Sequence, residues 1–212
     1  MLFSSSPTSV TALFVALFLL ALAPNLSVLI VTTRAATSGS RQGILAVLGI
    51  VAATLIYVFA AIIGLMIVAD MRPEARQVLR LLSAIYLIWS GMGVIRNSSK
   101  APLASLPVTH RDAASFSMGF ILTMINIKAL ILYLSFLPVF INPGSLNLQG
   151  TLILLGVVAL ATGAAKLAYV VASAGERIVP SVRVGKALNV IAGIVLAVSG
   201  FLLASGRVLR NY

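Results

Sequence analysis

The first long apolar segment of the chain is interrupted by the stretch LAPNLS at residues 22–27. A second apolar segment carries an amide in similar surroundings, in the stretch MINIK at residues 124–128. The hydrocarbon core of a bilayer offers no water to polar groups, so an amide or ammonium there costs free energy and usually serves a function. One interrupted segment in each half of a membrane protein is a common sequence sign of a transport site.

The composition is that of an integral membrane protein. Of the 212 residues, 60% are hydrophobic and 9% are charged, whereas soluble domains carry roughly 25% charged residues. The mean hydropathy is +1.13. The net charge of +11 comes from cations grouped between the apolar segments. Such grouping suits contact with anionic lipid head groups, and it excludes the clustered basic groove of a nucleic-acid-binding protein.

Six apolar segments are long enough to suggest membrane spans, since a spanning helix needs about 20 apolar residues. They lie at about 10–32, 44–68, 78–95, 114–141, 148–173 and 187–204. We therefore predict an all-α integral membrane protein with six transmembrane helices in a single transmembrane domain, 1–212. The first repeat covers about 8–96, a polar linker covers 97–112 and the second repeat covers about 113–206. Three spans in each half predict two inverted three-helix repeats.

Pro24 and Asn25 are predicted to form a polar break inside the first span. A proline has no backbone N–H, so the carbonyl one turn before it loses its helical partner. That carbonyl and the Asn25 amide are suited to hold a zwitterionic ligand, and Asn126 offers a matching amide in the second half. The alternative is a structural kink in which Asn25 bonds to a neighbouring helix.

Lys128 carries a positive charge near the middle of the fourth predicted span. An ammonium near the bilayer centre costs at least about 2.5 kcal/mol, and no Asp or Glu lies inside any predicted span. Its partner is therefore a helix C-terminus, a backbone carbonyl, water or a substrate carboxylate. Snorkelling of the side chain toward the membrane interface is the structural alternative.

Two further polar residues inside the spans are candidates for the same site. Lys166 in the fifth span either lines the same cavity or reaches toward Glu176. Tyr57 in the second span can hydrogen-bond a ligand, although such residues more often bond helix to helix. The predicted substrate-binding residues are Pro24, Asn25, Asn126, Lys128, Lys166 and Tyr57.

No catalytic, metal or cofactor site is predicted. The chain has no Cys, and its single His110 lies in the polar linker. It also has no buried carboxylate pair, no Ser/His/Asp set and no phosphate-binding loop. We therefore predict that the protein is not an enzyme and needs no cofactor.

Several short strings together resemble the LysE/RhtB-type amino-acid exporter family. The Pro-Gly-Pro-Asn motif of that family is matched by LAPN at 22–25, and its Asn-Pro-Lys motif by NIK at 126–128. Further similar strings are GSRQG at 39–43, YLIWSG at 86–91, FSMGF at 116–120 and LPVF at 137–140. Leu22, Ala23 and Ile127 replace a Pro or Gly of the motifs. Each change removes a helix breaker, so we expect less unwound helices than the family motif implies.

The resemblance implies a secondary transporter that exports amino acids or related small metabolites across the bacterial inner membrane, with proton antiport as its energy source. The predicted partners are an amino-acid-like substrate and protons, together with the anionic lipids that the cation grouping indicates; a homo-oligomer is an open alternative. One alternative is a non-transporting or degenerate membrane interaction protein. Another is an inorganic-ion exporter, which the absence of Cys, membrane His and membrane carboxylates disfavours.

Overall fold

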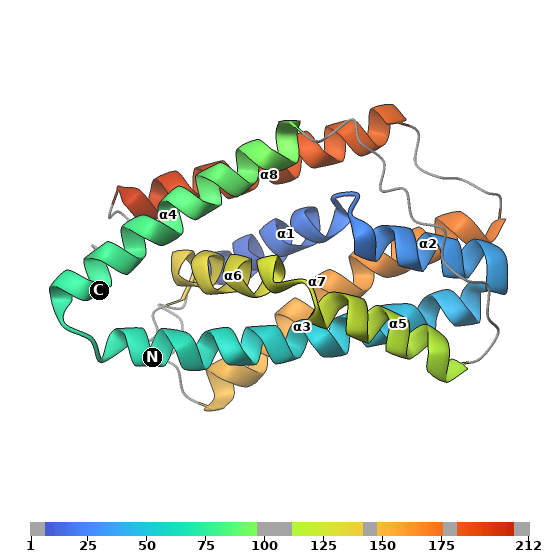
Figure 1. Cartoon of the computed structure of the whole chain (residues 1–212), viewed down its shortest axis with the longest axis horizontal. Helices are drawn as coiled ribbons and strands as arrows, with labels where there is room; N and C mark the ends of the chain where they lie inside the picture. Colours follow the sequence, from blue (N-terminus) through green and yellow to red (C-terminus); the bar gives the residue numbers. More distant parts are fainter. Residues whose placement is uncertain (1–6, 97–111, 142–147, 176–181, 206–212) are drawn as a thin grey trace.

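The computed structural model describes residues 7–96, 112–141, 148–175 and 182–205 (Figure 1). Most of these residues are helical, and none lies in a strand. The elements are α1 (Pro7–Leu22), α2 (Leu26–Ser38), α3 (Ser40–Ala69), α4 (Pro73–Arg96), α5 (Asp112–Met124), α6 (Ile127–Phe136), the 3-10 helix η1 (Leu137–Val139), α7 (Leu148–Gly175) and α8 (Val182–Ala204). His110 and Glu176, considered above, lie outside the described residues.

Within the described residues, α3, α4, α7 and α8 are each long and apolar enough to cross a membrane alone. The first and fourth predicted spans are bent pairs instead. α1 meets α2 at 66°, and α5 meets α6 at 62°. The part of the chain that the structure describes is therefore that of a helical membrane protein with four candidate spans, or six if each bent pair is one span. Both segments are broken next to their asparagine although Leu22, Ala23 and Ile127 replace helix breakers of the family motifs.

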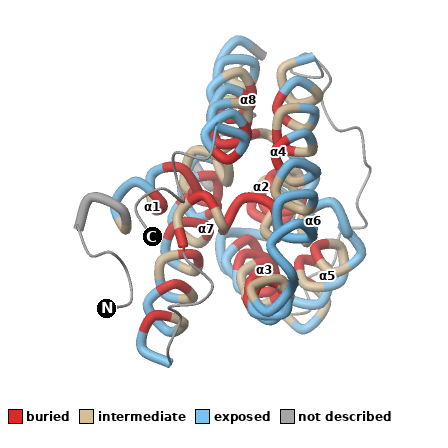
Figure 2. The backbone as a smooth tube through the Cα atoms, turned by 90° about the vertical axis from the view of Figure 1, so that its left-hand side faces the viewer, coloured by how far each residue is buried: buried red, intermediate tan, exposed pale blue. Residues whose placement is uncertain are grey.

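α4 and α8 pack side by side (Figures 1 and 2). They run antiparallel, because Arg80 near the start of α4 donates from Nε to the carbonyl of Leu203 near the end of α8, at 2.7 Å. Further along, a methyl group added at Gly91 would lie 2.5 Å from the carbonyl oxygen of Gly193. Glycines at such a crossing allow two membrane helices to approach closely, which adds van der Waals contact.

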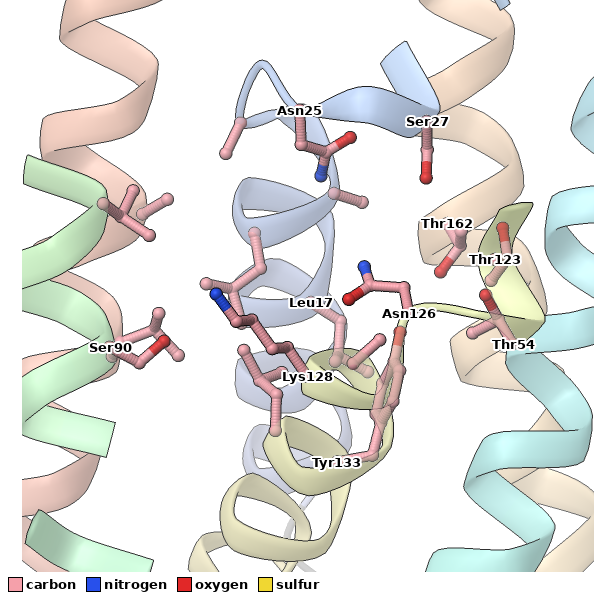
Figure 3. A pocket seen from close by; sticks show the side chains of 18 of the residues that line it. Leu17, Asn25, Ser27, Thr54, Ser90, Thr123, Asn126, Lys128, Tyr133 and Thr162 are labelled. Atoms are coloured by element: carbon pink, nitrogen blue, oxygen red, sulfur yellow. The ribbon is translucent and has the colours of Figure 1, made fainter. Parts of the chain in front are cut away.

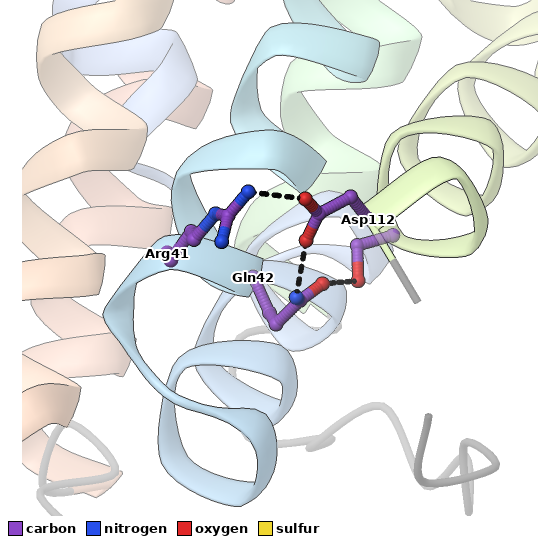
Figure 4. A network of polar contacts seen from close by, with 4 residues as sticks. Arg41, Gln42 and Asp112 are labelled. Carbon is purple, nitrogen blue, oxygen red and sulfur yellow. Dashed lines mark hydrogen bonds and ion pairs between the residues drawn. The ribbon is translucent and has the colours of Figure 1, made fainter. Parts of the chain in front are cut away.

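α3 and α5 run parallel and are joined near their first residues by hydrogen bonds and an ion pair (Figure 4). Arg41 Nη2 lies 2.5 Å from Asp112 Oδ2, and Gln42 Nε2 donates to Asp112 Oδ1 at 2.8 Å. Ser115 Oγ donates to Gln42 Oε1 at 2.6 Å. In the next turns, any side chain at Gly49 would collide with the backbone of α5. This polar network and the close crossing fix where the end of α5 lies along α3.

The apolar core leaves a polar space between the helix pairs. α3 and α7 run antiparallel, since Gly43 lies beside Val170 and Gly163 faces Val51. The larger apolar cluster is built from residues of several helices, including Leu13, Val58, Leu87, Phe136, Leu154 and Leu196. The α4–α8 pair meets the rest of the molecule mainly through α1 and α6. The candidate site lies between that pair and the two bent helices.

Candidate functional site

A cavity of about 580 Å³ lies where the two helix breaks meet (Figure 3). Residues from all eight α-helices line it. Its polar lining consists of three amides, two lysines and several hydroxyls: Asn25, Asn126, Asn189, Lys128, Lys166, Ser27, Ser90, Thr54, Thr123, Thr162, Tyr86 and Tyr133. No Asp or Glu is among the lining residues, so the charged groups of the described cavity wall are both cationic.

The first break separates α1 from α2 at Ala23, Pro24 and Asn25. Pro24 cannot donate a backbone hydrogen bond, so α1 cannot continue through it. Asn25 then caps α2, because its Oδ1 accepts a hydrogen bond from the backbone N–H of Val28 at 3.1 Å. An amide at this position satisfies one of the free donors at a helix start. The sequence therefore explains this break locally, and both Pro24 and Asn25 line the cavity.

The second break separates α5 from α6 at Ile125 and Asn126. No proline is present here, and the side chain of Asn126 makes no capping hydrogen bond. The backbone N–H of Asn126 donates to the Thr123 carbonyl at 3.0 Å, which closes a tight turn. The Asn126 side chain lines the cavity instead. Its amide is therefore not committed to holding the break open.

Tyrosines on the long helices hold the ends of both broken helices. Tyr57 on α3 donates from its hydroxyl to the carbonyl of Met124, the last residue of α5. Tyr169 on α7 donates to the carbonyl of Leu22, the last residue of α1, at 2.6 Å. Tyr57 is not among the residues that line the cavity, so its contact is with the backbone of the break.

Tyr169 was missed by the sequence prediction, although a signal for it was present. The string AATLIYVFA at 52–60 recurs as AAKLAYVVA at 164–172, with six of nine positions identical. This repeat places Tyr57 and Tyr169 at equivalent positions of α3 and α7. It also pairs Thr54 with Lys166, and both of these residues line the cavity.

The two lysines differ in how they are held. Lys166 is 2% exposed, and its Nζ donates to the carbonyl of Ala21 at 2.7 Å and approaches Asn25 Oδ1 at 3.5 Å. Lys128 lies in the first turn of α6 with an exposed side chain. Its ammonium has no hydrogen bond or ion pair to any described residue, while its carbonyl accepts from the Tyr86 hydroxyl at 3.1 Å. Lys128 is therefore the cavity cation whose ammonium no described residue binds.

Hydroxyl groups line the wall formed by α3, α5, α6 and α7. Thr123 Oγ1 is buried and has no hydrogen-bond partner among the described residues. The Tyr133 hydroxyl is hydrogen-bonded with the side chains of Thr54 and Thr162. Because buried polar groups are nearly always paired, the orphaned Thr123 hydroxyl is a position where a polar solute or water fits.

Comparison with known proteins agrees with this architecture. A sequence model of the family described as "LysE type translocator" matches residues 18–207. The chain belongs to this family. An uncharacterized membrane protein of Synechocystis sp. is 30% identical over 200 residues, which cover 93% of this chain and 97% of the relative. No solved structure matches the chain. Translocator families consist of membrane transporters, which are not enzymes, so the chain is a transporter-type membrane protein.

Proposed function

We propose that this protein exports amino acids or related small metabolites across the bacterial inner membrane by proton antiport, with the solute bound in the cavity at the two helix breaks. The observation that carries the proposal is the Lys128 ammonium, which lies in that cavity without a partner in the described chain. An uncompensated ammonium at membrane depth costs at least about 2.5 kcal/mol. A solute carboxylate removes that cost.

The remaining polar groups suit the other end of an amino acid. The broken end of α1 presents carbonyl oxygens, and Asn25 adds a side-chain oxygen. Asn126 is free to bond either end of a solute, because it does not cap α6. We therefore propose Pro24, Asn25, Asn126, Lys128 and Lys166 as the solute site, with Tyr57 positioning the second break.

We further propose that the two halves are inverted repeats that alternate the side from which the cavity opens. Equivalent helices run antiparallel, as α3 with α7 and α4 with α8. Each broken helix is held by a tyrosine from the long helix of the other half. Motion of one half against the other would therefore shift both breaks together, as alternating access requires.

Flux through purified protein in vesicles tests the proposal. Proteoliposomes are loaded with a mixture of 14C-labelled L-amino acids, and loss of label is followed with and without an opposing proton gradient. We expect efflux above that of empty vesicles, stimulated by the gradient. Absence of efflux for every amino acid under both conditions would contradict the proposal that the protein exports amino acids and would favour a non-transporting role.

A further inference from the structure

The Lys166 ammonium occupies acceptors that a solute ammonium would need. Its Nζ lies 2.7 Å from the Ala21 carbonyl oxygen and 3.5 Å from Asn25 Oδ1. The Ala21 carbonyl lies in the last turn of α1, where the helix dipole favours a positive charge, and Asn25 Oδ1 lies beside it at the start of α2. They also border the cavity, which Ala21, Asn25 and Lys166 all line. One cation can use this set at a time, since two ammonium groups on the same oxygens repel each other.

The surroundings of Lys166 contain no acid that would accept a proton in its place. The helices packed against α7 are α1, α2 and α3. Described α1 residues carry no titratable side chain. The charged or titratable groups on the other packed helices, on α7 and across the cavity are Arg34, Arg41, Tyr57, Tyr169, Tyr86, Lys128 and Tyr133. A proton exchanged at neutral pH within the described cavity therefore has an amine as its carrier.

Lys128 does not meet the requirement for the proton carrier of an antiporter. The Lys128 ammonium attracts a solute carboxylate, so the bound solute and that charge lie together instead of excluding each other. Antiport requires that proton and solute exclude each other at the shared site. Lys166 meets this condition, because a solute ammonium at the Ala21 and Asn25 oxygens displaces the Lys166 ammonium and repels its charge.

We propose that Lys166 carries the exchanged proton, so that its protonated form and the ammonium-bearing solute occupy the end of α1 in turn. This rests on the proposed export function. When the solute binds, the N–H bond of the Lys166 ammonium breaks, the electron pair stays on Nζ and the proton passes to cavity water. When the solute leaves, Nζ takes a proton from water on the other side. One proton enters for each zwitterionic solute that leaves, so each cycle moves one positive charge inward.

Substitution of Lys166 tests whether this residue couples amino-acid accumulation to the proton gradient, separately from exchange of the amino acid itself. In proteoliposomes with the membrane potential clamped by potassium and valinomycin, one pH unit supports about tenfold accumulation of label in one-for-one exchange. In Lys166→Met we expect this accumulation to fall to about onefold, while slower exchange of labelled for unlabelled amino acid persists. In Lys166→Arg we expect exchange itself to be lost, because guanidinium stays charged and does not vacate the acceptors. Lys186→Met, an exposed lysine of α8 outside the cavity, is the matched control and keeps the accumulation of the wild type.

A measurement on the wild-type protein tests the same proposal without depending on whether the variants fold. The amino-acid mixture is added to detergent-solubilised protein in weak buffer, and a pH dye reports released protons. We expect about one proton for each solute bound at neutral pH. Binding without proton release, or a Lys166→Met protein that still accumulates label tenfold, overturns the assignment of Lys166 while leaving export intact. A wild-type protein without any flux overturns the export function itself.

Discussion

The two helix breaks bend the chain by nearly the same angle, 66° and 62°, but for different reasons. The first break is encoded locally, since Pro24 stops α1 and the Asn25 side chain caps α2. The second has no proline, and Asn126 does not cap α6. A contact from another helix, the Tyr57 hydroxyl on the Met124 carbonyl, holds it. The first break is therefore encoded in the local sequence, while the second depends on a tertiary contact and leaves the Asn126 side chain without a capping role.

Among the changes that compare the two breaks, the largest expected effect is at the second break, where Lys128→Met removes the unpartnered cation. We expect transport to fall about 100-fold, because the carboxylate of a bound solute loses a charge-assisted partner at membrane depth. Initial rates of labelled amino-acid efflux from proteoliposomes measure this. Lys186→Met is the control for removal of a lysine charge. Normal efflux from Lys128→Met would remove Lys128 from the proposed solute site.

Removal of the tyrosine hydroxyls compares the two breaks directly. Tyr57→Phe leaves the Met124 carbonyl without its donor, so we expect about a tenfold loss of efflux. Tyr169→Phe removes the equivalent bond to Leu22, but Pro24 and the Lys166 contact remain, so we expect a loss of about threefold. The ratio of the two efflux rates is the measurement. Equal losses would contradict the claim that the second break depends more on tertiary contacts.

Substitutions of the two asparagines distinguish a role in helix capping from a role in solute binding. Asn25→Ala removes the cap of α2 and should lower stability by about 1 kcal/mol, seen as a lower Tm in detergent. Asn25→Ser keeps a capping oxygen and should recover most of that loss. Asn126→Ala should leave the Tm near that of the wild type and raise the solute concentration for half-maximal efflux. A lower Tm in Asn126→Ala alone would reverse this assignment.

The smallest expected effect comes from restoring the family's proline at the second break. Ile127 is the first residue of α6 and is 65% exposed, and proline is well suited to that helical position. Ile127→Pro should make the second break resemble the first, so that Tyr57→Phe then costs efflux about threefold instead of tenfold. A double-mutant cycle on efflux rates measures the coupling. Strict additivity of the two changes would show that Tyr57 and the backbone break are independent.

Much of the site was predictable from local features. Pro24, Asn25, Asn126, Lys128 and Lys166 were predicted as one site, and all five line the same cavity. That they bind a solute remains a proposal. The persistence of the second break was not predictable from Ile127, because the contact that holds the break is the bond from Tyr57 to Met124, which lie 67 residues apart in the chain. Tyr169 was missed because the repeat containing it was not recognised.

The sequence by itself determined that the chain lies in a membrane, where its apolar segments fall and where two of them are interrupted. These properties depend on hydropathy, on proline and on single polar residues, all of which act over one helix turn or one span. The tertiary structure decided that the two breaks meet in one cavity and that one lysine is bonded while the other is not. Lys166 reaches the Ala21 carbonyl across 145 residues of chain, and hydrogen bonds of that range exist only once the helices have packed.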